Sequence, residues 1–159
     1  MSDFKAFQDL ERQGWSDPWR VSGYVNLFAS VSDQAIGSLL EAVNAKPKLK
    51  ALDLCCGQGN VSEALAPCGC EVTGVDFSPA MLAFAYARVP NAVFIRADAQ
   101  ELPFDSEEFD IAVSNLGVCH VPDLARALSE ARRVLGRRGG FAMTVWCGPD
   151  VSPCFENCL

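Results

Sequence analysis

The residues best suited to chemistry in this chain stand where short apolar segments end. Gly57 and Gly59 follow one such segment, and Asp76 follows the next, 17 residues after Gly59. Glycine lets the backbone approach a ligand closely, and a carboxylate at about this spacing accepts hydrogen bonds from the two hydroxyls of a ribose. The pattern indicates a nucleoside-containing ligand. A turn that binds nothing is the alternative, because glycine pairs also occur there.

Two further segment ends carry polar residues. Asp98, after the third apolar segment, is a candidate acceptor for the hydrogen bond of an exocyclic amine. The backbone N–H of Ala99 is a candidate donor to a ring nitrogen. Asn115 ends the fourth segment, and His120, the only histidine, lies in the loop beyond it. Each of these residues also suits a turn or a helix cap. Their repetition at successive segment ends favours one shared crevice.

The elements that must position these residues alternate between strand and helix. Strands are predicted at 50–55, 70–77, 92–99, 109–117 and 139–146, and helices at 33–43, 60–67, 78–89 and 123–135. The first thirty residues are predicted to be irregular or helical. Alternation of this kind predicts βαβ units and a parallel sheet. Doubly wound sheets bind ligands outside the carboxyl ends of their strands, so we expect an α/β fold with the site at that edge.

Length and composition narrow the class of protein. The 159 residues suit one domain, which we divide into an N-terminal helical cap (1–47), a core (48–146) and a short tail (147–159). The formal net charge of −7 argues against partners such as nucleic acid or anionic membranes. No apolar run reaches the ~20 residues of a membrane helix, and residues 1–15 lack the pattern of a signal peptide.

Eight cysteines are present, but their placement does not suggest a disulfide framework. Cys55 and Cys56 are adjacent at a predicted strand end, and Cys119 falls in an apolar stretch, where free cysteine behaves as a small hydrophobe. We therefore expect a reducing, cytoplasmic setting. No metal site is predicted, since the cysteine spacing matches no zinc pattern.

Four stretches carry a resemblance to a known family: ALDLCCGQGNVSEAL, VTGVDFSPAML, IRADAQELPFDSEEFDIAVSNLGVCHVPD and ALSEARRVLGRRGGFAMTVW. Over about residues 48–146, the sequence resembles the Rossmann-like class I S-adenosylmethionine-dependent methyltransferases. It is most similar to the group that includes the ubiquinone and menaquinone biosynthesis methyltransferases. The resemblance implies strand order 3-2-1-4-5, S-adenosylmethionine as cofactor and methyl transfer to an acceptor. The implied cofactor-binding residues are Tyr24, Asp53, Cys56, Gly57, Gly59, Asp76, Phe77, Asp98, Ala99 and Asn115.

The acceptor side is less defined. The only histidine, His120, is a candidate catalytic base and equally a structural loop residue. Trp15, Trp19, Tyr24 and Cys119 are candidates for an acceptor pocket, although Trp15 and Trp19 fit better as a hydrophobic cover for the sheet. The absence of a basic groove favours a small-molecule acceptor.

Two other functions stay open. The first is a nicotinamide dehydrogenase. Its fingerprint needs a third small residue three positions after the second glycine, and this chain has Ser62 there, which is not glycine. A cofactor-binding module with weak catalysis is the second, because similar proteins continue for two more strands beyond the position of Trp146. The same consideration leaves strand 139–146 as an apolar edge, and we expect a homodimer to cover it.

Overall fold

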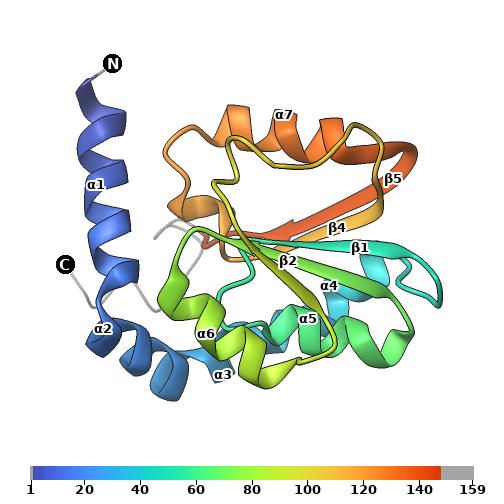
Figure 1. The fold of residues 1–159 in the computed structure, drawn as a ribbon, viewed down its shortest axis with the longest axis horizontal. Helices are drawn as coiled ribbons and strands as arrows, with labels where there is room; N and C mark the ends of the chain where they lie inside the picture. Colours follow the sequence, from blue (N-terminus) through green and yellow to red (C-terminus); the bar gives the residue numbers. More distant parts are fainter. Residues whose placement is uncertain (1, 148–159) are drawn as a thin grey trace.

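The computed structural model describes residues 2–147 and contains one five-stranded parallel sheet (Figure 1). The strand order is β3-β2-β1-β4-β5, which confirms the predicted order. The strands are β1 (Lys50–Leu54), β2 (Glu71–Asp76), β3 (Val93–Arg96), β4 (Phe109–Asn115) and β5 (Leu135–Thr144). Because every strand runs the same way, all carboxyl ends lie at one edge of the sheet.

Helices cover both faces of the sheet, as predicted (Figure 1). On one face lie α4 (Ile36–Ala42), α5 (Asn60–Leu65) and α6 (Pro79–Arg88), and on the other lies α7 (Leu124–Val134). Neighbouring strand residues pack on opposite sides: Ala51 belongs to the core under α4 and α5, and Leu52 to the core under α7. This double burial explains the near-continuous apolar runs of the central strands.

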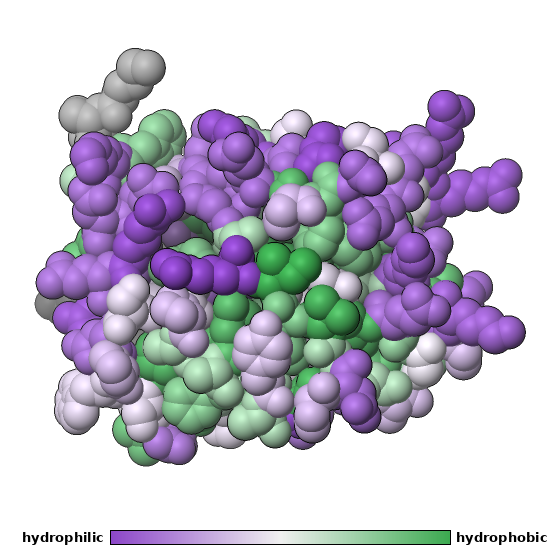
Figure 2. Space-filling view, in the orientation of Figure 1, coloured by the Kyte–Doolittle hydropathy of each residue, from purple (hydrophilic) through white to green (hydrophobic). Residues whose placement is uncertain are grey.

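Side-chain caps begin α6 and α7. Ser78 accepts a hydrogen bond from the Met81 N–H before α6, with Pro79 at the first helical position. Asp123 accepts one from the Arg126 N–H before α7. Each cap satisfies a backbone donor that the first helical turn leaves unpaired. The outward side of α7 is polar, and hydrophilic side chains gather along the top of the molecule in Figure 2.

Residues 2–35 are helical apart from Asp17, which caps the second helix. They form α1 (Ser2–Ser16), α2 (Pro18–Gly23), a π-helical turn η1 (Tyr24–Phe28), α3 (Ala29–Ser32) and a 3₁₀ turn η2 (Asp33–Ala35) that leads into α4. Two more 3₁₀ turns follow, η3 (Ala66–Cys68) and η4 (Val118–His120). Helix α1 stands beside the sheet (Figure 1) and contacts α6. No helix in residues 2–147 is long and apolar enough to cross a membrane.

The largest departure from the predicted elements is at β5. The strand begins at Leu135, not at residue 139, and Gly136 lies inside it. Leu135 pairs with Phe109, the ladder is then irregular, and regular pairing resumes where Ile111 faces Gly140. An extended residue directly after a helix leaves no local sequence signal, so the pairing with β4 decides the start of this strand.

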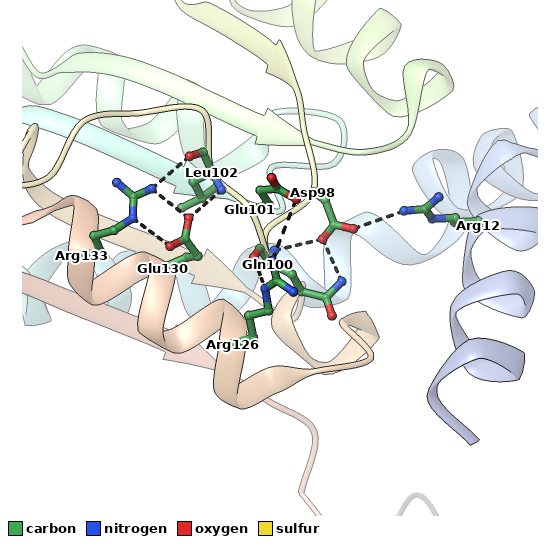
Figure 3. A network of polar contacts seen from close by, with 8 residues as sticks. All are labelled: Arg12, Asp98, Gln100, Glu101, Leu102, Arg126, Glu130 and Arg133. Carbon is green, nitrogen blue, oxygen red and sulfur yellow. Dashed lines mark hydrogen bonds and ion pairs between the residues drawn. The ribbon is translucent and has the colours of Figure 1, made fainter. Parts of the chain in front are cut away.

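The long connection between β3 and β4 contains no helix and is held by side chains of α7 (Figure 3). Arg133 donates to the carbonyls of Leu102 (3.0 Å) and Phe104 (2.7 Å), and Glu130 accepts from the Leu102 N–H at 2.8 Å. Arg133 also donates to Glu130 at 2.8 Å. These bonds fix the connection between β3 and β4, which contains Asp98.

Candidate functional site

A cavity opens at the carboxyl edge of the sheet, where the turns after β1, β2, β3 and β4 converge with α1. The cavity is partly open to solvent, and the about 1020 Å³ of free space within its lining includes that open part. The predicted site residues that line it are Tyr24, Asp53, Cys56, Gly57, Asp76, Phe77, Asp98, Ala99, Asn115 and His120. Gly59 is the predicted site residue that does not.

Asp76 ends β2 with its side chain nearly buried, at 8% exposure. Its Oδ1 accepts from the Ser78 N–H at 2.8 Å, and its Oδ2 accepts from the Gly57 N–H at 2.9 Å. Burial raises the pKa of Asp76, while these backbone hydrogen bonds act in the opposite direction. Each oxygen keeps a second lone pair, so the carboxylate can still accept from two neighbouring hydroxyl groups.

The two glycines of the first turn have different reasons to be glycine. Both have positive φ, +53° at Gly57 and +82° at Gly59. A Cβ on Gly57 would meet nothing within 4 Å, so this position leaves open space beside the cavity. A Cβ on Gly59 would lie 3.2 Å from both Cα and Cβ of Ala85 on α6. Packing against α6 therefore favours glycine at position 59, and the contact of Gly59 with a ligand stays a prediction.

Asp53 is buried at the end of β1, with 1% exposure. Its Oδ2 accepts from the backbone N–H of Ser62 at 2.9 Å and from the Ser62 hydroxyl at 2.6 Å. Desolvation raises the pKa of Asp53 to about 7, although both hydrogen bonds from Ser62 oppose the rise. Ser62 stands where the fingerprint of a nicotinamide dehydrogenase has its third glycine. Its structural role is to hold Asp53 across the first turn.

Asp98 is held from two sides (Figure 3). Its Oδ1 accepts from the backbone N–H and the side-chain amide of Gln100, both at 2.9 Å, and its Oδ2 accepts from Arg12 of α1 at 3.2 Å. Burial by itself would raise the pKa of Asp98, but the hydrogen bonds from Gln100 and Arg12 bring it below the usual value. Asp98 therefore faces the cavity as a charged group.

Asn115 joins three segments at the end of β4. Its amide donates to the Ser32 carbonyl at 2.9 Å, and its Oδ1 accepts from the Thr144 hydroxyl at 2.6 Å. Thr144 Oγ1 also accepts from the Leu116 N–H at 3.0 Å. Asn115 thus ties the N-terminal region and β5 to the rim of the cavity.

The two adjacent cysteines of the first turn, Cys55 and Cys56, lie in different environments. Cys55 has a left-handed φ of +59° and lines the cavity. A Cβ on Gly117 would lie 2.4 Å from the Cβ of Cys55, so the absence of a side chain at 117 makes room for it. Cys56 also borders the cavity, but its buried side chain packs in the α6 core with Leu82 and Phe94.

Helix α1 adds residues to the cavity that the sequence alone did not single out. Glu11, Arg12 and Gln8 line it, together with Trp15, and the carbonyl of Trp15 accepts from the Ser78 hydroxyl at 2.5 Å. Trp15 therefore borders the cavity and is not a cover for the sheet. Trp19, by contrast, is 84% exposed and does not line it.

His120 lies in η4 and borders the cavity beside Glu11 and Trp15. Its Nδ1 lies 2.8 Å from Glu11 Oε2, and its ring meets Trp15 edge-on with centroids 5.2 Å apart. The side chains of Cys119 and Glu11 raise the pKa of His120, against the opposing effect of burial. The pairing links residues 109 positions apart, so no local motif could have indicated it.

Residues 4–147 bring together no group of three or more His, Cys, Asp or Glu side chains that could hold a metal ion. Cys154 and Cys158 lie outside the described residues.

Comparison with known proteins places this fold and cavity in a wider group. A family described as Methyltransferase domain matches residues 52–143. A demethylmenaquinone methyltransferase of Staphylococcus aureus is 36% identical over 126 residues, which are 75% of this chain and 52% of that protein. The chain therefore spans about half the length of the curated relatives it matches.

Two solved structures share the fold of this chain and are also similar to it in sequence. The PH0226 protein from Pyrococcus horikoshii OT3 has a TM-score of 0.72 at 29% identity, covering 87% of this chain and 65% of that one. A putative methyltransferase from Bacillus halodurans has a TM-score of 0.69 at 27% identity, covering 79% and 57%. Residues 52–143, which match the family, include the turns after β1, β2 and β3 that border the cavity.

Proposed function

The chain belongs to the family of methyltransferase domains, and from this premise we propose that it binds S-adenosylmethionine in the cavity and transfers the methyl group to a small-molecule acceptor. The observation that carries the proposal is the Asp76 carboxylate. It is nearly buried, lines the cavity and is oriented by the N–H groups of Gly57 and Ser78. Each of its oxygens keeps a free lone pair, and the two hydroxyls of a ribose can donate to them.

The cavity residues fit this cofactor in other respects. Gly57 leaves open space where a side chain would stand, and the buried Oδ1 of Asn60, another cavity residue, has no hydrogen-bond partner among the described residues. A buried unpaired oxygen is costly, so a ligand donor would satisfy it. Tyr24 and Phe77 supply apolar aromatic surface on the same cavity.

In this arrangement each segment holds one part of the cofactor. Asp76 would bind the ribose, with Phe77 beside the adenine, and Asp98 and the Ala99 N–H would meet the adenine edge. The first turn (Asp53 to Gly57) and Asn115 would hold the methionine part, with Tyr24 closing over it. The bound sulfonium supplies a methyl group already activated for in-line displacement. The protein's contribution is to orient the acceptor and exclude water.

For the chain as a whole, we propose one domain in which residues 1–47 cap the cofactor-binding core at 48–146. The described cysteines are all free, which supports a reducing, cytoplasmic location. The described sheet ends at β5, and we propose that a second copy covers this edge in a homodimer.

Calorimetry with S-adenosylmethionine and with S-adenosylhomocysteine tests the proposal directly. We expect both to bind, and Asp76→Ala to weaken binding by about 1–3 kcal/mol, because the ribose hydroxyls lose a charged acceptor. Asp105→Ala, which removes an exposed carboxylate that does not line the cavity, should leave affinity unchanged. No heat with either compound would refute cofactor binding, and binding without methyl transfer to any of a panel of acceptors would refute the enzymatic function.

A further inference from the structure

We propose that Glu11 is a positioning residue that fixes His120 as the proton acceptor for an acceptor molecule bearing a hydroxyl on an aromatic or enolic carbon. This inference rests on the proposed methyl transfer, and it names the acceptor class and the residue of α1 that serves it.

The first support is the geometry of the Glu11–His120 pair. Glu11 Oε2 lies 2.8 Å from His120 Nδ1 and also accepts from the Trp15 indole N–H at 2.9 Å. An ionised carboxylate only accepts hydrogen bonds, so Nδ1 must carry the proton of the neutral imidazole. The lone pair is then on Nε2. Glu11 thus selects the ring atom that is able to take a proton.

The second support is the confinement of the ring. Trp15 meets the imidazole edge-on at 5.2 Å and 81°, and Glu11 is held by the Trp15 indole one helical turn away on α1. Both residues come from a different segment from His120, and all three border the cavity that contains Asp76. A ring that is oriented from two sides needs little reorientation to meet the hydroxyl of a bound acceptor.

The charges around the ring favour its basicity. The titratable groups that act on His120 are Cys119 beside it, Glu11 from α1 and, at longer range, Asp76 from the end of β2. Cys119 and Glu11 raise the pKa of His120. A base with a raised pKa is a stronger proton acceptor once it is deprotonated.

The walls of the cavity indicate the shape of the acceptor. Trp15 packs edge-on against Tyr24 with centroids 5.2 Å apart, and both line the cavity. From Tyr24, aromatic contacts continue to Phe28 at 5.7 Å and on to Trp146 at 5.6 Å. Trp15 and Tyr24 thus form an aromatic wall beside His120, which suits a planar, largely apolar molecule, while Phe28 and Trp146 continue the row of rings outside the cavity.

The proposed step balances in atoms and charge. The acceptor hydroxyl gives its proton to His120 Nε2, and an oxygen electron pair forms the new bond to the methyl carbon of the sulfonium donor. The carbon–sulfur bond breaks, and its electron pair stays on sulfur. The products are the methyl ether, the neutral thioether and the imidazolium of His120, which Glu11 stabilises and which releases its proton to solvent.

The single histidine allows a direct test by nuclear magnetic resonance. The chain gives one imidazole signal, whose titration reports the pKa of His120 and whose nitrogen shifts report the tautomer. We expect the Nδ1–H form in the wild type, and Glu11→Gln to lower the His120 pKa, because a neutral amide no longer stabilises the imidazolium. Asp9→Asn is the matched control: Asp9 lies on the same helix and pairs with Lys5, so its loss should leave the titration unchanged. An unaltered pKa in Glu11→Gln would overturn the role of Glu11.

The acceptor class is tested on the protein loaded with S-adenosylhomocysteine, using catechol as the probe. Binding should shift the Nε2 resonance of His120, and the absence of any shift at millimolar catechol would overturn the hydroxyl acceptor. Methylation of catechol should fall by about 10²–10⁴-fold in His120→Ala. Because calorimetry measures cofactor binding independently, retained cofactor affinity with no response at His120 would refute this inference alone.

Discussion

At the scale of single residues, the cavity contains carboxylates that folding removes from water. Asp53 is the clearest case: it is 1% exposed, only Ser62 hydrogen-bonds it among the described residues, and burial raises its pKa from 3.8 to about 7. Between these two pH values the folded protein binds a proton that the unfolded chain does not. Linkage then requires stability to fall as pH rises from about 4 to about 7, where Asp53 becomes charged in both states.

We therefore expect Asp53→Asn to remove this part of the pH dependence. The neutral amide oxygen still accepts from Ser62, so the variant should gain stability relative to the wild type as pH rises from 4 to 7. Urea unfolding across that range measures the difference between the two free energies of unfolding. An exposed control, Asp105→Asn, should give a difference that is flat with pH, and a flat difference for Asp53→Asn would contradict the assigned burial cost.

At the scale of elements, the turn after β1 is shaped by a residue near the end of β4. Cys55 has a φ of +59°, a backbone conformation that costs an ordinary residue about 1–2 kcal/mol. Gly117, in the turn after β4, accommodates the Cys55 side chain by having none of its own. The two turns that border the cavity therefore depend on each other.

Gly117→Ala should destabilise the protein by about 1–3 kcal/mol, because the new Cβ would lie 2.4 Å from the Cβ of Cys55. The double variant with Cys55→Gly should recover part of this loss. It would not recover all, since the Cys55 carbonyl remains 3.0 Å from the same Cβ. Thermal or urea unfolding of both variants measures the coupling, with Gly37→Ala, which has open space around it, as the tolerated control. Additive effects of the two substitutions would show that the turns are independent.

At the scale of the whole molecule, the described sheet has unequal edges. One edge is the four-residue strand β3, and the other is the ten-residue strand β5. Arg137 and Arg138 stand near the start of β5, but its second half, from Gly139, has no charged residue. Long, uncharged edge strands invite pairing with another chain, which is the basis for the proposed homodimer.

Sedimentation at micromolar concentration tests this assembly, and we expect a mass of twice 17.2 kDa. Met143→Lys places a charge on β5 at a side chain that is 40% exposed, and it should shift the equilibrium toward the monomer. Val93→Lys, at an exposed position on the opposite edge, should leave the dimer intact. A monomeric wild type would show that β5 is covered within the chain.

The sequence by itself determined the alternation of elements and the edge of the sheet at which the site lies. Buried parallel strands read as apolar runs, and helix caps such as Ser78 and Asp123 are local signals. Asp76 and Asp98 could also be placed at the cavity from the sequence, because residues at the end of a predicted parallel strand lie at the carboxyl edge of the sheet. The strand order came from the resemblance to a family, because periodicity does not specify which strands are neighbours.

Only the tertiary structure decided the contacts between segments distant in sequence. Three of these contacts join elements for which no local sequence pattern indicates the partner. They are the Glu11–His120 pair, the dependence of Cys55 on Gly117 and the packing of Gly59 against Ala85. The early start of β5 likewise depends on its pairing with β4. Such contacts arise from how α1, the turns and the sheet are packed in space. For this reason the predicted residues near the cavity are visible in the sequence, but the contacts that orient them are not.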